Sequence, residues 1–325
     1  MKYSIAIPAY KVEYLNRCIE SVLDQDLSDF ELIIVNDASP YDIDSVIEKY
    51  HDSRIKYYKN KKNCGAEHVV DNWNICLSYC SGEFVALMGD DDEMMPGYLS
   101  TFNKLIDEFP NLNVYHCRSY IINEKSEPIS ITQSWPKWES VYENIWHRMN
   151  FVRSQYISDF VYKREFLLER NGFYKLPLAW ASDDITSFEA AIGKGIAHTQ
   201  EPLFCYRQSH TTISNSGSAE LKLKAIQGEE IWYGNFIKDS EPKIELDRLF
   251  LNYIRKEYHH YFLKKKIETV AYFGFSNNND FKDFIYWYKR RKKFNLTIQH
   301  LIYIYILFKK SKKAIIKNDN LFDKN

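Results

Sequence analysis

The sequence predicts an α/β protein, a doubly wound and mostly parallel sheet followed by a helical C-terminal extension. In the N-terminal third, short apolar runs rich in β-branched residues alternate with segments whose apolar residues recur at helical spacing. This alternation is typical of a parallel sheet with helices on both faces. Beyond about residue 215 only helical periodicity remains. We therefore expect two parts, residues 1–215 and residues 216–325.

Four strands and three helices are predicted before the pattern weakens. The run FELIIVN is almost continuously apolar, as in strands that are buried on both faces. The turn DASPYD follows it and can open a short helix. The predicted strands are 3–8, 30–36, 54–59 and 83–88, and the longer helices are 13–25 and 67–80.

From residue 112 onward the pattern is less regular. A strand is predicted over 113–122, whereas 124–155 is a polar stretch that contains three tryptophans. Residues 158–195 predict a strand-like piece, a short helix, a glycine turn and a further helix that begins near Ser182. No internal repeat or low-complexity block is present.

The C-terminal region differs in charge from the rest of the chain. Residues 284–317 carry ten Lys or Arg and no Asp or Glu, which leaves 33 basic and 44 acidic residues elsewhere. The segment LTIQHLIYIYILF lies here between KRRKK and KKSKK. Basic flanks around an apolar segment suit an anionic membrane surface. The alternative is a helix packed on the N-terminal part with its lysines outward. We expect no nucleic-acid partner.

Cysteine usage and hydropathy predict a cytoplasmic protein, peripheral on the inner membrane face if the tail binds lipid. The six cysteines form no CxxC pair and no zinc-site spacing, so free thiols in a reducing compartment are expected. Pro8, Lys11 and Glu13 interrupt any signal-peptide core. No stretch has the ~18 apolar residues that a membrane-spanning helix needs.

Three consecutive aspartates, Asp90, Asp91 and Asp92, follow the fourth predicted strand. Adjacent carboxylates raise one another's pKa unless a cation or water screens them, and the sequence places no basic residue beside them. Asp37 follows the second strand in the same way. Ligands of parallel α/β sheets bind outside the carboxyl ends of the strands. We therefore expect a divalent cation at the triplet rather than a solvated turn.

Five segments follow one another along the chain: SIAIPAYK, ELIIVNDASPYD, NCGAEHVVDNWNICLSYCSGEFVALMGDDDEMMPGYL, GFYKLPLAWASDD and YRQSH. Taken together and in this order, they resemble the family 2 glycosyltransferases, inverting enzymes with the GT-A fold that include bacterial surface-polysaccharide enzymes. The resemblance implies a GT-A domain over residues 1–215. It also implies transfer of a hexosyl or N-acetylhexosaminyl group from a nucleotide-diphosphate sugar to a glycan or lipid-linked glycan. The implied cofactor is Mn²⁺ or Mg²⁺.

The resemblance assigns the metal to the triplet. A divalent cation stabilises, as a Lewis acid, the charge that develops on the pyrophosphate leaving group. Counted back from Pro96, Asp91 stands at the family's metal position. Asp90 stands where ribose and metal contacts begin, and Asp92 is an additional acid. The family's usual first acid is Gly89 here, so the DxD motif is present only as a shifted run.

A second group is implied to bind the nucleotide sugar. Asp37 stands where the family contacts the base, and its carboxylate can accept the imide N–H of uracil. The alternative is that Asp37 only caps the helix after Pro40. Asn74 matches a weaker donor position, next to Trp73 where many relatives have arginine. The residues implied to line the base pocket are Pro8, Ala9 and Tyr10.

The run SDD is implied to supply the general base, which takes the proton of the acceptor hydroxyl. Asp184 aligns with the family's base and Asp183 with the acid before it. Because Ser182 and both aspartates also suit a helix N-terminus, capping is the alternative. Trp180 is either a platform for the acceptor sugar or a core residue.

Arg207 and His210 resemble a loop that closes over the pyrophosphate. Arginine pairs with phosphate oxygens, and His210 is expected to ligate the metal or to contact the leaving group.

Two other functions fit the residues less well. A resemblance to the sugar nucleotidyltransferases would imply a glycine-rich phosphate loop after the first strand. The corresponding segment here, PAYKVEYLNR, contains no glycine. A non-catalytic, membrane-associated protein with a decayed transferase domain would have lost its acids, whereas every catalytic acid has a candidate here. The sequence therefore predicts a metal-dependent inverting glycosyltransferase.

Overall fold

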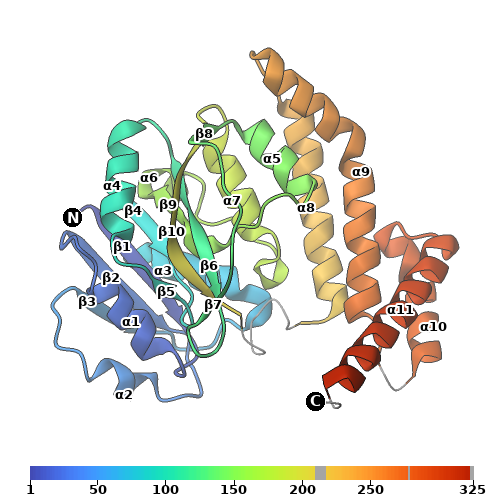
Figure 1. Cartoon of the computed structure of the whole chain (residues 1–325), viewed down its shortest axis with the longest axis horizontal. Coiled ribbons are helices and arrows are strands. Elements are labelled where there is room, and N and C mark those ends of the chain that lie inside the picture. The colour runs from blue at the N-terminus through green and yellow to red at the C-terminus, as the bar shows by residue number, and fades with distance from the viewer. Residues whose placement is uncertain (209–216, 277–278, 323–325) are drawn as a thin grey trace.

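A computed structural model describes residues 1–208, 217–276 and 279–322, and the side chains of residues 1–208, 217–276 and 279–312. Within these residues a mixed sheet has the strand order β3-β2-β1-β4-β9-β6-β10-β5, with β7 on β6 and β8 on β10. The N-terminal strands lie at one end of the molecule and the C-terminal helices at the other (Figure 1).

The first four strands form the parallel part of the sheet. β1 pairs in parallel with β2 and β4, and β2 pairs in parallel with β3. Every residue of β2 is buried, as expected where helices cover both faces. The strands are β1 (Tyr3–Ala9), β2 (Phe30–Asn36), β3 (Ile55–Lys59) and β4 (Phe84–Leu87), and the helices are α1 (Leu15–Leu23), α2 (Ile43–Ile47), η1 (Ala66–His68) and α3 (Val69–Tyr79). These elements confirm the predictions to within about two residues at most ends.

The second half of the sheet is mixed. β9 lies antiparallel between β4 and β6, and β10 runs parallel to β6 and antiparallel to β5. The strands are β5 (Glu93–Met94), β6 (Val114–Ile122), β7 (Pro128–Ile131), β8 (Trp138–Glu139), β9 (Phe160–Lys163) and β10 (Ile196–Arg207). The helices are α4 (Tyr98–Glu108), α5 (Val141–Met149), η2 (Ile157–Asp159), α6 (Arg164–Glu169), η3 (Pro177–Ala179) and α7 (Ser182–Ala191). The mixed α/β, mostly parallel architecture confirms the predicted fold class.

Two regions have more regular structure than their sequence predicts. The polar stretch 124–155 contains β7, β8 and α5, whose first turn is capped by the Ser140 hydroxyl. The long strand β10 continues to Arg207, so the expectation that Arg207 belongs to a loop is wrong. The register of β10 shifts around Pro202, and the polar residues there interrupt the apolar run that would have identified the strand.

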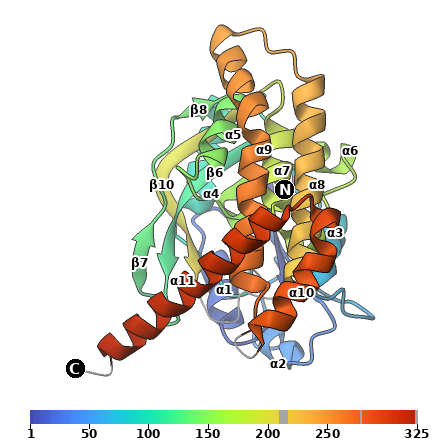
Figure 2. The same cartoon turned by 90° about the vertical axis from the view of Figure 1, so that its right-hand side faces the viewer.

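The C-terminal part is helical, as predicted, and it shares a core with the sheet. Residues of α8 and α9 pack in one cluster with residues of β1, β2 and α7. Figure 2 shows α11 crossing in front of α9 and extending away from it toward the C-terminus. The helices are α8 (Ala219–Asp239), α9 (Glu245–Phe273), α10 (Asp280–Arg290), η5 (Arg291–Phe294) and α11 (Ile298–Phe322). The boundary expected at residue 215 lies in a segment outside the described residues and stays a prediction.

The apolar character of the helices and the state of the cysteines were also predicted. Of the helices described, none combines the length and apolar character needed to cross a bilayer. All six cysteines are free thiols, as expected. Five are buried and Cys64 is half-buried.

Candidate active site

The carboxyl ends of β1, β2 and β4 converge on one site. One carboxylate oxygen of Asp90, Oδ2, accepts hydrogen bonds from the backbone N–H groups of Tyr10 and Lys11, each at 2.6 Å. The N–H of Asp37 donates to the carbonyl of Ala9 at 3.0 Å. The aspartates that were predicted at separate strand ends therefore lie around the end of β1.

The three aspartates of the triplet occupy different surroundings. Asp90 and Asp92 are buried, whereas Asp91 is half-buried. Asp92 accepts the backbone N–H of Arg207 at 2.8 Å, and Asp91 pairs with the Lys11 ammonium at 3.1 Å. The expectation that no basic residue lies beside the triplet is wrong. Lys11 follows β1, which the sheet places next to β4, so its position was not visible in the local sequence.

The electrostatics of the triplet favour a cation. Burial, followed by the charge of Asp91, raises the pKa of Asp90 to about 6, and the same two causes raise the pKa of Asp92. Among the described residues no hydrogen bond occupies Oδ1 of Asp90 or of Asp91. Carboxylate oxygens are the ligands that Mg²⁺ and Mn²⁺ prefer. The residues present therefore fit a divalent cation.

Gly89 explains why the DxD motif is shifted in this chain. A Cβ at position 89 would lie 2.6 Å from Oδ2 of Asp92 and 3.3 Å from Oδ1 of Asp91. A side chain at position 89 therefore has no room unless the Asp92 carboxylate moves. The carboxylate of Asp92 thus occupies the space that a side chain at position 89, where the family usually has its first acid, would need.

Asp37 organises the loop that follows β3. Its buried carboxylate accepts hydrogen bonds from the amides of Asn60 (2.8 Å) and Asn63 (3.1 Å) and from the backbone N–H of Cys64 (3.1 Å). Helix α2 is capped instead by Asp42, whose carboxylate accepts the N–H of Ser45. The capping alternative for Asp37 is therefore wrong.

The other residues implied in donor binding differ in exposure. Ala9 is fully buried, Pro8 is half-buried, and Tyr10 is exposed with its ring edge-on to Tyr41. Ala9 can therefore contribute backbone only. The amide of Asn74 accepts the backbone N–H of Phe173 at 2.8 Å, which fastens α3 to the segment before α7. Donor contacts of these residues stay predictions.

Arg207 is fully buried and contacts the triplet through its backbone N–H, which donates to Asp92, and through its guanidinium, which donates to the carbonyl of Asp91. Its guanidinium lies over the ring of Tyr14 at 4.1 Å from the centroid and pairs with Glu93. It also donates to the carbonyl of Asp91 (2.6 Å), the carbonyl of Asn123 (2.8 Å) and the hydroxyl of Ser126 (3.0 Å). This geometry supports a role in fixing the aspartate loop, and contact with the pyrophosphate stays a prediction. His210 lies outside the described residues.

The SDD run begins helix α7 without capping it through a side chain. The N-cap is Ala181 in the left-handed conformation, and no described side chain bonds to the cap. Side-chain capping of α7 is therefore not seen among the described residues, but both aspartates lie in the first turn of the helix, where its dipole stabilises a negative charge. Asp184 instead receives two bonds from the guanidinium of Arg148, at 3.0 and 2.9 Å, and one from the amide of Gln155 at 2.7 Å.

Asp183 has different surroundings from its neighbour. Burial, and then the charge of Asp184, raise the pKa of Asp183 to about 7. No ion pair to Asp183 occurs in the part of the chain that is described. A carboxyl group whose pKa is raised toward neutrality by burial and a neighbouring charge is typical of acid–base sites.

Tyr156 lies within electrostatic reach of both acidic groups. Burial, followed by the charge of Asp159, raises the pKa of its hydroxyl, and the charges of Arg148, the partner of Asp184, and of Asp92 also act on it. Trp180 is half-buried against Phe273 of α9, which agrees with a core contact and leaves its role as a platform untested.

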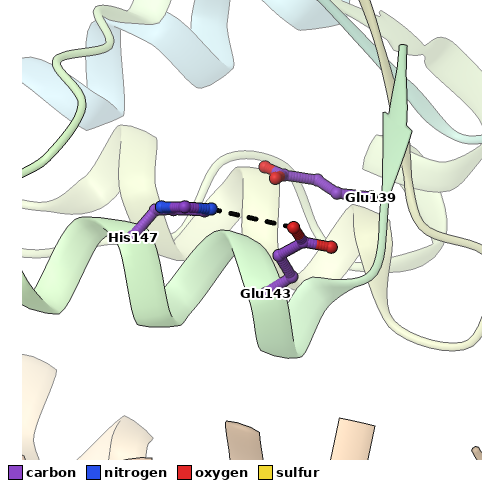
Figure 3. A group of neighbouring side chains, drawn as sticks. All are labelled: Glu139, Glu143 and His147. Atoms are coloured by element: carbon purple, nitrogen blue, oxygen red, sulfur yellow. Dashed lines mark ion pairs between the residues drawn. The ribbon is translucent and has the colours of Figure 1, made fainter. Parts of the chain in front are cut away.

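A third acidic cluster lies on α5 and β8. Glu139, Glu143 and His147 have ligand atoms within 4.8 Å of one another, and Nε2 of His147 is 3.7 Å from Glu143 (Figure 3). The buried Glu139, however, pairs with the guanidinium of Arg153 at 2.6 Å. Because the arginine already supplies positive charge, we assign this cluster a structural role.

Comparison with known proteins identifies the family. Residues 4–175, more than half of the chain, match the family described as glycosyl transferase family 2. The chain therefore belongs to glycosyl transferase family 2, and the resemblance that its motifs carry is confirmed.

Curated relatives match over parts of their length. The chain is 36% identical over 110 residues to GalNAc(5)-diNAcBac-PP-undecaprenol beta-1,3-glucosyltransferase of Campylobacter jejuni, which is 33% of this chain and 35% of that protein. It is 34% identical over 161 residues to the putative colanic acid biosynthesis glycosyl transferase WcaA of Escherichia coli K12, 47% of this chain and 54% of that protein. The chain therefore spans about a third to a half of these relatives.

Solved structures share the fold at low identity. Residues 1–349 of TarS from S. aureus in complex with UDP-GlcNAc superpose with a TM-score of 0.65 at 16% identity, covering 97% of this chain and 92% of that one. The mannosyltransferase PcManGT of Pyrobaculum calidifontis in complex with GDP-Man and Mn²⁺ gives a TM-score of 0.52 at 14% identity, covering 100% and 88%. These likenesses show the fold and confirm the GT-A-type expectation.

Proposed function

We propose that this protein is a metal-dependent inverting glycosyltransferase that moves a sugar from a nucleotide-diphosphate sugar to a hydroxyl of a glycan or lipid-linked glycan. The observation that carries the proposal is the convergence of Asp37 and the aspartate triplet at the carboxyl ends of β1, β2 and β4, where α/β sheets bind ligands. Family membership supports the same conclusion.

Donor recognition is assigned to the ends of β1 and β2. The carboxylate of Asp37 accepts the imide N–H of a uracil, or a donor on another base. Tyr10 and Tyr41 present exposed rings beside it, which suits stacking on a base. The TarS structures contain UDP or UDP-GlcNAc and the PcManGT structure contains GDP-Man, so related folds hold sugar nucleotides of both kinds.

Leaving-group departure is assigned to the triplet. Mn²⁺ or Mg²⁺ held there supplies Lewis-acid stabilisation of the diphosphate as the glycosidic bond breaks. Asp91 is the most accessible of the three carboxylates and would be the principal ligand. Asp90 would assist, and Asp92 would hold the aspartate loop in place by accepting the backbone N–H of Arg207.

Inversion is proposed because the SDD run offers a general base. In a single displacement the acceptor oxygen attacks the anomeric carbon while a carboxylate takes its proton. The raised pKa of Asp183 supports such a role at neutral pH. The hexosyl or N-acetylhexosaminyl class of the sugar is a proposal that rests on the relatives' names and the UDP-GlcNAc complex.

The acceptor is proposed to be reached at an anionic membrane surface on the cytoplasmic side. The name of the Campylobacter relative specifies an undecaprenol-linked glycan. In this chain the buried side of α11 packs on α9 through Leu301 and Ile304, as the packed-helix alternative expects. Its outer side nevertheless exposes Ile302 and Ile306 between the basic segments, which suits an anionic bilayer.

A panel of sugar nucleotides tests this function. Purified protein is incubated with UDP- and GDP-sugars and Mn²⁺, and nucleotide release and the anomeric configuration of the product are measured. We expect release from at least one sugar nucleotide, and a product of inverted configuration. A retained configuration would contradict the inverting mechanism. Tight binding without turnover of any member would support the non-catalytic alternative.

A further inference from the structure

We infer that Arg148 and Gln155 are positioning residues for Asp184, which hold its carboxylate so that one hydrogen-bonding site, on Oδ2, stays open for the acceptor hydroxyl. This inference rests on the proposed function and deepens it. Asp184 is the residue of the SDD run to which the family resemblance gives the role of general base. Arg148 and Gln155 lie outside the segments that carry the resemblance.

The hydrogen bonds of Asp184 occupy most of its carboxylate. An ionised carboxylate has two oxygens, and each accepts about two hydrogen bonds. Nε of Arg148 lies 3.0 Å from Oδ1, and Nη2 lies 2.9 Å from Oδ2. Nε2 of Gln155 adds a second bond to Oδ1, at 2.7 Å. Among the described residues no other group donates to this carboxylate, so Oδ1 is saturated and Oδ2 has one acceptor site left. The side chain is not fully enclosed, since Asp184 is 7% exposed.

The two donors are themselves held in place. Arg148 lies in the last turn of α5, and its third nitrogen, Nη1, donates to the carbonyl of Arg153 at 2.7 Å. Gln155 is buried in the segment that follows α5. A two-point pair between arginine and a carboxylate fixes the plane of the carboxylate as well as its position. Because Asp184 lies in the first turn of α7, the C-terminal end of α5 sets the direction in which this side chain leaves α7.

The amide of Gln155 is oriented by Asp184 and not by its other surroundings. Its Oε1 is buried and finds no hydrogen-bond partner in the part of the chain that is described. Buried polar atoms without a partner are rare in native proteins, and each one destabilises the fold. The opposite orientation of the amide would bring Oε1 against a carboxylate oxygen, where the two negative partial charges repel. The fold therefore keeps an unpartnered oxygen in order to keep the Gln155 N–H on Asp184.

A fixed carboxylate with one open site matches what a single displacement needs. The acceptor O–H donates to Oδ2 of Asp184 while the acceptor oxygen attacks the anomeric carbon. As the new C–O bond forms, the proton passes to Oδ2, and the bond to the diphosphate breaks with its electron pair on the diphosphate. A displacement of about 1 Å in such a group can reduce the rate by roughly 10²-fold. A carboxylate that is free to rotate should therefore reduce turnover without weakening donor binding.

The variant Gln155→Met separates positioning from stability. Methionine has a similar length, but it removes the N–H on Asp184 and the unpartnered Oε1 together, while both arginine bonds remain. We therefore expect Tm close to that of the wild-type chain. Turnover of UDP-glucose, UDP-GlcNAc and GDP-mannose is measured with Mn²⁺, beside UDP and GDP affinity by calorimetry. The kcat of Gln155→Met should fall roughly 10- to 100-fold with unchanged nucleotide affinity. A purely structural residue would not lower kcat while Tm stays the same.

Two further variants of the full chain control for charge and for stability. Arg148→Lys keeps the positive charge but cannot meet both carboxylate oxygens in a fixed plane, so kcat should fall by roughly 10²-fold with unchanged nucleotide affinity. Arg153→Met is the matched control, because it breaks the buried pair with Glu139 at 2.6 Å and leaves the bonds of Asp184 in place. It should lower Tm and keep kcat near the wild-type value at temperatures where the variant is folded.

The outcomes of these measurements are distinct. Asp184→Asn is the reference and should lose roughly 10²–10⁴-fold in kcat. Wild-type turnover in Gln155→Met and Arg148→Lys would overturn the inference, and so would normal turnover in Asp184→Asn. An equal loss of kcat in Arg153→Met and Gln155→Met would also overturn it, because the segment as a whole would then matter and not its contact with Asp184. A wild-type chain that turns over none of the three sugar nucleotides contradicts the proposed function instead.

Discussion

The ammonium of Lys11 lies 3.1 Å from Oδ2 of Asp91, so a residue that follows the first strand neutralises the accessible carboxylate of the triplet. Both side chains are partly exposed, at 22% and 16%. A pair of this kind contributes ~0.2–1 kcal/mol, which a divalent cation can readily replace. The Lys11 ammonium would therefore compete with a metal ion for the carboxylate of Asp91, or would move to the diphosphate when the metal binds.

Removal of metal should abolish turnover of sugar nucleotides. Among the described residues, EDTA leaves Lys11 as the positive side chain that pairs with Asp91, and an ammonium cannot coordinate the diphosphate as Mn²⁺ does. Activity that survives EDTA unchanged would contradict metal dependence.

The variant Lys11→Gln should bind Mn²⁺ up to about fivefold more tightly, because the competing ion pair with Asp91 is lost. Calorimetric titration with Mn²⁺ measures this change.

The substitutions Asp91→Asn and Asp92→Asn should differ in severity. Asp91→Asn removes the accessible ligand charge and should reduce kcat by roughly 10²-fold or more, since a Lewis acid contributes several kcal/mol. Asp92→Asn retains an oxygen that can accept the N–H of Arg207, so its loss should be much smaller. Steady-state kinetics at saturating Mn²⁺ compares them. Similar losses would mean that the metal is shared evenly by the two residues.

The substitution Asp37→Ala should weaken UDP binding. A hydrogen bond to a charged group contributes ~1.5–3 kcal/mol, so we expect a roughly 10- to 100-fold rise in Kd. Because Asp37 also binds Asn63, Asn63→Ala is the matched control, in which the loop loses one bond and the carboxylate remains. If the two variants weaken UDP binding equally, Asp37 acts only through the loop.

The outer face of α11 should bind anionic lipid. The full chain should co-sediment with phosphatidylglycerol vesicles and much less with phosphatidylcholine vesicles. Ile302→Glu should abolish this binding, because a charge would enter the apolar layer. Ile231→Glu is the control, since Ile231 is at least as exposed as Ile302 (64% against 50%) but lies on α8. Vesicle binding that is insensitive to Ile302→Glu would show that the outer face of α11 is not the lipid-binding surface.

The parts of the fold and site that could be predicted are those that local sequence encodes. The strands β1, β2 and β4 are short apolar runs, and the triplet and Asp37 follow them directly, so their convergence follows from the rule for parallel sheets. The helix that begins at Ser182 was visible from its spacing in the same way.

The partners of these acids could not be predicted, because they come from distant segments. Arg148 and Gln155 reach Asp184 across 36 and 29 positions, and Lys11 reaches Asp91 across 80. Arg148 and Gln155 lie outside the segments that carry a motif, and the stretch around Arg148 is polar without clear periodicity. Lys11 ends the segment SIAIPAYK, but nothing in that segment indicates that its ammonium meets Asp91. Arg207 was recognised as part of a motif, but its burial in β10 depends on a strand that polar residues interrupt.

A metal-dependent diphosphate site is tested most sharply by the affinity for UDP with and without Mn²⁺, measured by calorimetry on the wild-type chain and on Asp91→Asn. We expect UDP to bind the wild-type chain tightly only with Mn²⁺, and Asp91→Asn in Mn²⁺ to bind UDP no better than the wild-type chain does in EDTA. Equal UDP affinity in Mn²⁺ and in EDTA, or an Asp91→Asn variant that retains the Mn²⁺-dependent gain, would contradict a diphosphate site built on the aspartate triplet.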